Sequence, residues 1–502
     1  MRRLSWLLPM ALLASCAAGP SARPAIVVND GDQVPPATTA SGPRPLPPLD
    51  EPKNSLMRWV PCGPEITDRL AKLAPPAALK IDCGRVSGVL DSPYAPGRGN
   101  MRMQVLRVGT GPVPLVVVND VDGLPGTLYA VRLAMSLPAD FLNQYSLVGL
   151  DRRGTGNSDA VRCVPEEVRA KLVDLDPRSG DVEPLVDLAR TAGQQCTLTL
   201  ESRLPAIDTW RTAADIESTR VALGMAHLHA IGHGEGSRVL SVFAERFPDK
   251  VGRMVLDGLP DPNEDPVVAM VGVAEGADAA FSAFAEDCAR RACELGANAR
   301  QALSEVLALP DFPLAPGVVL RAVLAALHDR QSWPALSKAI ADARGGDTDG
   351  LAAFANPVVQ ETDELPATYD GTLVTRCNDT RGRLSTAQLS ATAKDWNTRY
   401  PVFGGLIAQW LAVCSPWPVA SHPVTQPQAA SAPPMVVLST ATDAVTPHSG
   451  TERAAQQLTS AVLVSWQGAG HGAFGVSACA TEAVTAFFTG GTLPRNGTVC
   501  PP

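Results

Sequence analysis

Short apolar runs recur along the chain and alternate with helical patterns, and this feature restricts the fold more than any other. Such continuous runs are typical of strands buried on both faces of a parallel sheet. Apolar residues at helical spacing over 237–247 predict a helix that Pro248 ends. The sequence therefore predicts an α/β fold, a mostly parallel sheet with helices on both faces. Its strands contain the runs 114–118, 145–150, 228–231, 254–256, 435–438 and 462–466.

The region 262–425 interrupts this alternation, because it is rich in alanine and helical in pattern throughout. We expect it to form a helical cap inserted into the fold. Residues 53–261 would then be the first part of the α/β core, and residues 426–502 its C-terminal part.

The N-terminus has the pattern of a targeting segment, with two arginines before an apolar stretch from Leu4 to Leu13. The sequence Leu13-Ala14-Ser15-Cys16 resembles the lipobox of bacterial lipoproteins. Residues 1–16 are therefore predicted to be a lipoprotein signal peptide, with Cys16 carrying the lipid at the outer face of the cell membrane. An ordinary cleaved signal peptide is the alternative. Residues 17–52, rich in Pro, Ala and Ser, are expected to be a tether.

Composition narrows the possible partners. A net charge of -9 argues against nucleic acid and against an anionic membrane surface. We expect no internal window of this chain of 502 residues to be long and apolar enough for a membrane-spanning helix, and we expect a monomer.

The chain has 11 cysteines, and an even number remains once Cys16 is set aside. In an exported protein this number indicates disulfides. A metal site is the alternative, but no C-x-x-C pair provides zinc spacing. Connectivity does not follow from sequence alone. Proximity favours Cys62–Cys83, Cys163–Cys196, Cys288–Cys293, Cys377–Cys414 and Cys479–Cys500.

Three glycines, Gly232, Gly234 and Gly236, lie between the run 228–231 and the helix that follows it. A strand, a tight G-x-S-x-G turn and a helix form the nucleophile elbow of serine hydrolases. Gly234 occupies the place of the serine. Because glycine has no side chain, this position cannot attack a carbonyl.

A carboxylate and a histidine follow two later strands, in the chain order of a hydrolase triad. Asp443 comes just after the run 435–438, and His471 comes just after the run 462–466. In a working triad the histidine takes the proton of the nucleophile, and the carboxylate orients the imidazole and stabilises its charge. Asp443 and His471 are therefore expected to be the remnant of a triad.

As a set, these motifs resemble the exported tripeptidyl and prolyl aminopeptidases of actinobacteria, which are α/β-hydrolases. The resemblance covers most of residues 55–500 and is weakest in the cap. It implies a serine exopeptidase fold without a cofactor or metal. The matching segments are 150–158, 228–237, 247–258, 377–379, 414–418, 443–447 and 468–472.

Two departures from this group count against activity. The position of the group's serine falls on Gly234. The group's glycine-rich run after the first parallel strand here reads Asn119-Asp120-Val121-Asp122-Gly123-Leu124-Pro125-Gly126, and we call residues 119–126 the oxyanion loop. Backbone N–H groups at Gly123 and Glu235 are the expected oxyanion donors. Carboxylates at Asp120 and Asp122 would raise the energy of an oxyanion, and loss of one donor costs about 3–4 kcal/mol.

Ser237 is the nearest hydroxyl that could replace the missing one. It lies one helical turn beyond Gly234, so its Oγ is expected roughly 5 Å from the nucleophile position. Proton transfer to His471 requires about 3 Å. Ser237 is therefore expected to pack at the start of the helix. His227 and His233 are expected to pack near the elbow. Asp151, Arg152 and Arg153 are expected to form a structural network.

The sequence favours a lipid-anchored pseudo-enzyme that retains a pocket for a peptide or a small ligand. The alternative is an active hydrolase, a peptidase or esterase with a shifted or water nucleophile that uses His471 and Asp443. A third hypothesis, a structural protein of the cell envelope, requires a pocket filled by bulky side chains.

Overall fold

The computed structural model describes residues 44–49, 51–296, 298–359, 368–418, 424 and 426–502. The predicted signal peptide, Cys16, and positions 17–43 and 50 of the predicted tether lie outside the described residues.

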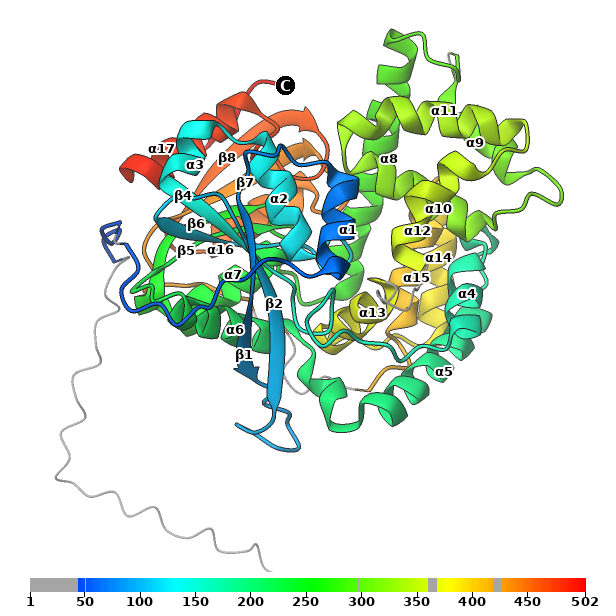
Figure 1. Cartoon of the computed structure of the whole chain (residues 1–502). Coiled ribbons are helices and arrows are strands. Elements are labelled where there is room, and N and C mark those ends of the chain that lie inside the picture. The colour runs from blue at the N-terminus through cyan, green and yellow to red at the C-terminus, as the bar shows by residue number, and fades with distance from the viewer. Residues whose placement is uncertain (1–43, 50, 297, 360–367, 419–423, 425) are drawn as a thin grey trace, which may run out of the picture. The chain divides into compact units, whose positions relative to one another are not determined.

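One mixed sheet contains the nine strands found in the described part of the chain (Figure 1). Its order is β1-β2-β4-β3-β5-β6-β7-β8-β9, and every pair from β4 onward in this order is parallel. The first two pairs are antiparallel. This arrangement confirms the predicted α/β-hydrolase fold class. The strands are β1 (Ile81–Val89), β2 (Asn100–Val108), β3 (Val113–Val118), β4 (Tyr145–Leu150), β5 (Leu228–His233), β6 (Val251–Asp257), β7 (Met435–Thr442), β8 (Ala461–Ala469) and β9 (Thr498–Cys500).

Two hydrophobic clusters cover the two faces of the sheet, because successive side chains of a strand point to opposite faces. In β3, Leu115 and Val117 belong to one cluster, and Val116 and Val118 belong to the other. The first face packs against α1 (Pro64–Leu73), α2 (Gly126–Ser136), α3 (Ala139–Gln144) and α17 (Ala478–Gly490). The second packs against α6 (Thr209–Ala222), α7 (Glu235–Arg246) and α16 (His448–Gln457).

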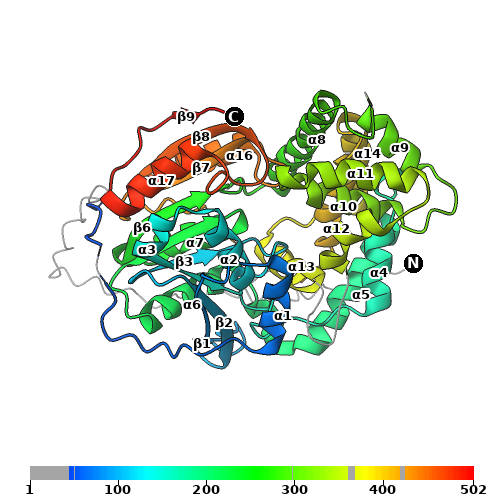
Figure 2. The ribbon, with the colours of Figure 1, turned by 45° about the horizontal axis from the view of Figure 1, so that its top comes forward.

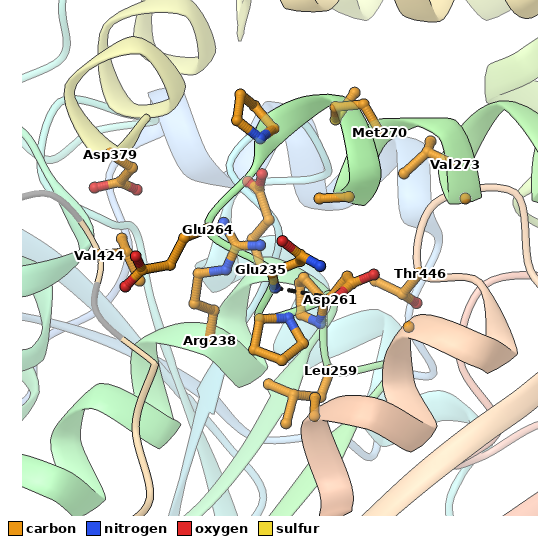
Figure 3. Close-up of a pocket in the computed structure, with 18 of the residues that line it drawn as sticks. Glu235, Arg238, Leu259, Asp261, Glu264, Met270, Val273, Asp379, Val424 and Thr446 are labelled. Atoms are coloured by element: carbon orange, nitrogen blue, oxygen red, sulfur yellow. Dashed lines mark hydrogen bonds between the residues drawn. The ribbon is translucent and has the colours of Figure 1, made fainter. Parts of the chain in front are cut away.

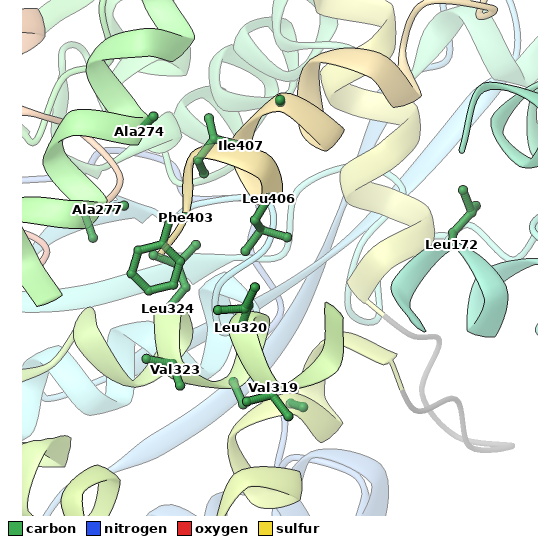
Figure 4. Close-up of a cluster of buried hydrophobic side chains, with 14 of the residues drawn as sticks. Leu172, Ala274, Ala277, Val319, Leu320, Val323, Leu324, Phe403, Leu406 and Ile407 are labelled. Atoms are coloured by element: carbon green, nitrogen blue, oxygen red, sulfur yellow. The ribbon is translucent and has the colours of Figure 1, made fainter. Parts of the chain in front are cut away.

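The helices after β6 form a third unit of packing, with its own apolar core. Phe403, Leu406 and Ile407 meet Leu320 and Leu324 in this core (Figure 4). The helices are α8 (Pro266–Arg290), α9 (Ala299–Leu307), α10 (Pro316–Leu327), α11 (Trp333–Arg344), α12 (Asp349–Val359), α13 (Thr368–Asp379), α14 (Thr386–Arg399) and α15 (Gly404–Val413).

Two earlier helices share that core. The helix α4 (Glu166–Asp174) lies beside α10 and α12 (Figures 1 and 2), and α5 (Glu183–Leu200) contacts α15. Leu172 of α4 and Leu185 of α5 are buried in the same cluster as the cap residues. The sequence analysis placed both helices in the α/β core, because they precede β6 in the chain.

The helix α8 corrects the expectation that no internal segment could span a membrane. By length and composition its 25 residues are apolar enough to do so. In the structure, Ala277, Phe281 and Phe284 on one face of α8 are buried in the core of the cap. An apolar helix of a globular domain meets the same criteria of length and composition.

Five disulfides join the ten cysteines in the neighbouring pairs that the sequence favours. Cys377–Cys414 connects α13 to the end of α15, and Cys163–Cys196 fixes α5 to the segment before α4. Disulfides of this number are typical of exported proteins.

Candidate functional site

The turn between β5 and α7 keeps the backbone of a nucleophile elbow. Gly234 has φ 53° and ψ -121°, a conformation that is strained for residues with a side chain. A Cβ at Gly236 would lie 2.5 Å from the carbonyl carbon of Val118, so the close approach of α7 to β3 requires glycine there. The elbow frame is therefore present without its serine.

Asp443 and His471 meet beside this elbow. His471 Nδ1 lies 3.0 Å from Asp443 Oδ2. The Asp443 carboxylate also accepts the backbone N–H groups of Val445 and Thr446 and the hydroxyl of Thr446. The backbone N–H of His471 donates to the carbonyl of His328 at the end of α10. The acid and the histidine thus have the contacts that a working triad needs on this side of the imidazole.

The side chain of Asp120 occupies the place where the nucleophile would lie. A Cβ added at Gly234 would lie 2.5 Å from Asp120 Cγ and closer still to both carboxylate oxygens. Asp120 Oδ2 lies 2.9 Å from His471 Nε2. Asp120 Oδ1 accepts the backbone N–H of Glu235 at 2.6 Å. One carboxylate therefore takes both the histidine contact of a serine and the backbone donor of an oxyanion.

The sequence analysis placed Asp120 beside an oxyanion, and the structure corrects this placement. Asp120 fills the oxyanion position itself. Gly123, the other expected donor, packs against Asn119, whose side-chain amide lies 2.9 Å from where a Gly123 Cβ would be. That amide donates to the carbonyl of Leu124. Of the two expected donors, the Glu235 N–H is therefore the one that lies at this position.

The charges of this group follow from burial and proximity. Burial alone would lower the pKa of His471, but the Asp443 and Asp120 carboxylates outweigh it and raise that pKa well above 6.5. Burial would raise the pKa of Asp443, but the charge of His471 and the hydrogen bonds lower it. Burial raises the pKa of Asp120, although His471 opposes this shift. The carboxylates of Asp443 and Asp120 thus favour the protonated form of His471.

Comparisons with known proteins identify the family of this chain. The family described as "TAP-like protein" matches residues 400–500, which contain Asp443 and His471. Carboxylesterase B of Mycobacterium tuberculosis is 30% identical over 459 residues, which cover 84% of this chain and 86% of that protein. The chain belongs to the TAP-like family of α/β-hydrolases.

Two further relatives of this family are similar over most of their length. Serine protease Hip1 of Mycobacterium tuberculosis is 28% identical, with 90% of this chain and 92% of that protein covered. The tripeptidyl aminopeptidase of Streptomyces coelicolor is 27% identical, with 84% and 83% covered. These names describe hydrolases. This chain has a glycine, Gly234, at the nucleophile position of the elbow.

An arginine of the cap joins the oxyanion loop to the elbow. Arg376 of α13 lies 2.7 Å from Asp122 and 3.0 Å from the Glu235 side chain. Its guanidinium lies 5.1 Å from the centre of the Trp410 ring. We call Asp122, Arg376 and Glu235 the cap clamp. The sequence analysis named the motif 377–379 and missed Arg376, because nothing in sequence spacing connects α13 to the elbow.

His233 and Asp257 are two further parts of the site that sequence reasoning did not assign to it. The His233 ring lies 4.3 Å from the His471 ring, between centroids, and stacks on Tyr129. Asp257 at the end of β6 accepts the backbone N–H groups of Ala473 and Phe474, and it thereby positions the loop of His471. Burial raises the pKa of Asp257 to about 6. Their positions at the carboxyl ends of β5 and β6 are the sequence feature that could have assigned both residues to the site.

Ser237 has a structural role, as expected. Its Oγ donates to the carbonyls of Gly232, at 2.9 Å, and Asp257, at 3.1 Å, and the residue is fully buried. Arg153 forms a buried ion pair with Asp215. Asp151 accepts hydrogen bonds from the backbone and the hydroxyl of Thr127. These side chains brace the core.

A cavity of about 220 Å³ lies between the core and the cap. Glu235 and Thr446, which contact Asp120 and Asp443 respectively, line its inner end. Figure 3 shows Arg238 of α7 and Met270 and Val273 of α8 around it. The cavity therefore borders the remnant site. Its apolar walls are Leu259, Met270, Val273, Trp410, Leu411 and Val445.

Proposed function

We propose that this TAP-like protein binds a peptide or a small ligand without hydrolysing it. The observation that carries the proposal is the position of Asp120. A substrate carbonyl needs both a nucleophile and the Glu235 N–H. Gly234 stands in the place of the nucleophile, and the Asp120 carboxylate already accepts the Glu235 N–H.

The cavity supports a ligand-binding role over a purely structural one. Ligand pockets are mostly apolar with a few polar groups that fix orientation. Here the apolar walls are joined by Arg238, Glu235 and Asp379. Burial raises the pKa of Asp379 to about 7. A structural protein of the envelope has no need of such a cavity.

Fluorophosphonate labelling tests the loss of serine chemistry. We expect no covalent adduct on the purified protein under conditions where an active serine hydrolase is labelled completely. An adduct that is absent from the His471→Ala variant would overturn the proposal. Mapping that adduct would identify the nucleophile.

Ligand binding needs a separate measurement. We expect peptides from a short-peptide library to raise the melting temperature of the protein, because a ligand that binds only the folded state stabilises it. The variant Val273→Trp, which fills the cavity from α8, should lose this shift and keep its fold. An equal shift in that variant would place the ligand elsewhere.

A second candidate function is a slow hydrolase in which water is the nucleophile. The intact hydrogen bond between Asp443 and His471 favours it, because a binding protein does not need this pair. Loss of one triad member leaves only about 10³–10⁴-fold acceleration over water. Slow turnover of a p-nitrophenyl ester that disappears in His471→Ala would support this candidate. Equal rates in both proteins would exclude it.

We further propose that the protein is exported and held at the cell membrane by a lipid on Cys16. The five disulfides support export, because they form in oxidising compartments. Cys16→Ser should move the protein from the membrane fraction to the soluble fraction and abolish incorporation of labelled palmitate. A Ser15→Ala variant is the matched control and should stay in the membrane fraction.

A further inference from the structure

Three side chains with metal-binding atoms converge at the position of the missing serine. Asp120, His233 and His471 each offer one such atom, and these atoms lie within 4.8 Å of one another. They come from three separate elements: the loop after β3, the end of β5 and the loop after β8. The fold therefore brings them together at the carboxyl edge of the sheet.

The distances between these atoms suit one shared ion. His471 Nε2 lies 2.9 Å from Asp120 Oδ2, and His233 Nε2 lies 3.7 Å from the same oxygen. Ligands bound tetrahedrally to Zn²⁺ at about 2.0–2.2 Å lie about 3.3 Å apart. The two observed separations lie on either side of this value, and all three ligand atoms lie within 4.8 Å of one another.

The outer nitrogens of both imidazoles face carboxylates. His471 Nδ1 is 3.0 Å from Asp443, and His233 Nδ1 is 4.0 Å from Asp257. Among the described residues, His233 Nδ1 is buried with no hydrogen-bond partner. Histidines that bind metals typically donate their second N–H to a carboxylate, which orients the ring and raises its basicity. His471 thus has an outer carboxylate in place, and Asp257 is the carboxylate near the unpaired Nδ1 of His233.

The local charge also favours a cation. The side chains of Asp120, Asp257 and Asp443 are at most 5% exposed, and they lie around the two imidazoles of His233 and His471. Buried carboxylates are normally paired with cations or bound to metals.

Glycine gives the His233 ring its place. A Cβ at Gly472, the neighbour of His471, would lie 2.5 Å from His233 Cε1. Any larger residue at 472 would push this ring away from His471. Gly234 likewise leaves room for the Asp120 carboxylate.

We propose that Asp120, His233 and His471 form a binding site for a divalent transition metal, with Zn²⁺ as the preferred ion. Two imidazoles and one carboxylate are the ligand set of many zinc sites that keep a position open for water. Mg²⁺ and Ca²⁺ prefer oxygen ligands alone. The ion takes the place of the proton between His471 and Asp120. None of the three ligand side chains lines the ligand cavity, which borders this site through Glu235 and Thr446.

Calorimetric titration of the chelator-treated full-length protein with ZnCl₂ tests the site. We expect one Zn²⁺ per chain with a Kd of about 1 μM or tighter. His233→Gln and Asp120→Asn should each weaken binding by at least about 100-fold, because each removes a ligand. His448→Gln is the matched control. Its imidazole lies beside Ser439 and Glu452, away from the site, and this variant should bind as the wild type does.

Co²⁺ provides an independent signal for the same site. Co²⁺ bound by two imidazoles and a carboxylate should show visible absorption bands that are absent from His233→Gln, and Zn²⁺ should displace it. Wild-type Zn²⁺ binding weaker than about 100 μM would overturn the proposal. Unchanged binding in a folded His233→Gln variant would also overturn it.

Discussion

The two ring nitrogens of His471 differ in how closely their partners match those of a hydrolase triad. On the Nδ1 side, Asp443 holds the ring with the contacts of a complete hydrolase. On the Nε2 side, the serine is absent and a carboxylate from the oxyanion loop has taken its place. The Nδ1 side has the partner of a hydrolase triad, and the Nε2 side has a carboxylate where a triad has a neutral hydroxyl.

This difference shows what the two sides depend on. The Asp443 side is built mainly from backbone donors at 445 and 446, which hold the carboxylate whatever reaction follows. The Nε2 side depends on one side chain at the elbow, and its loss leaves space that Asp120 fills. Both ring nitrogens of His471 therefore have a hydrogen-bond partner, Asp443 at Nδ1 and Asp120 at Nε2.

The largest effect is expected from removing the ring that both sides share. His471→Ala leaves Asp443 and Asp120 buried without their cation, and breaking a buried pair costs about 3–5 kcal/mol. Urea unfolding at pH 7 should show this loss in the free energy of unfolding. The control His448→Ala, at a more exposed histidine, should change it by at most about 0.5 kcal/mol. Equal losses would mean that the two carboxylates do not need His471.

The next effect concerns the Nε2 side alone. Gly234→Ser should restore almost no fluorophosphonate labelling, because the new Cβ overlaps the Asp120 carboxylate and the oxyanion donor stays engaged. The double variant Gly234→Ser with Asp120→Gly frees the space for the serine and the N–H of Glu235. Its labelling rate should be at least about 100-fold higher than that of Gly234→Ser alone. Labelling of the single variant at the rate of the double variant would show that Asp120 is no obstacle.

A smaller effect depends on pH. The pKa of His471 is raised above 6.5 in the folded state, so its contribution to stability is complete below pH 6.5. That contribution falls as the pH rises through the folded-state pKa, by up to about 1.4 kcal/mol per pH unit. The stability difference between wild type and His471→Ala should therefore shrink between pH 6.5 and the folded-state pKa. A difference that grows with pH would contradict the imidazolium.

The smallest effect is expected at Ser237, whose hydroxyl donates only to backbone carbonyls. Ser237→Ala should lower the free energy of unfolding by about 1 kcal/mol, the usual net value of one hydrogen bond. The ester turnover proposed for a water nucleophile should not change. A loss of that turnover would assign Ser237 to the chemistry and give the Nε2 side a nucleophile.

Much of the fold could be predicted from local pattern. The run 145–150 is β4 in full, and 114–118 lies within β3, because both strands are buried on both faces. The elbow and the loops of Asp443 and His471 follow from their places after strands. The apolar pattern of α8 was misjudged, since a helix buried along one face can be as apolar as a membrane span.

The contents of the site were harder to predict. Asp120 reaches Gly234 only because β3 and β5 are neighbours in the sheet, and strand order is not visible in a single sequence. The same holds for Arg376, which comes from the cap. His233 was expected to pack near the elbow, and its contact with His471 depends on a loop that Asp257 positions.

The burial of α4 and α5 in the core of the cap has a consequence for chimaeras. A graft that exchanged only residues 262–425 with a relative would leave Leu172 and Leu185 facing foreign side chains. The exchangeable unit therefore includes the segment 161–207, although β5 and β6 separate it from the remaining helices in the chain. Transfer of a relative's specificity would therefore require both segments, 161–207 and 262–425, in the same graft.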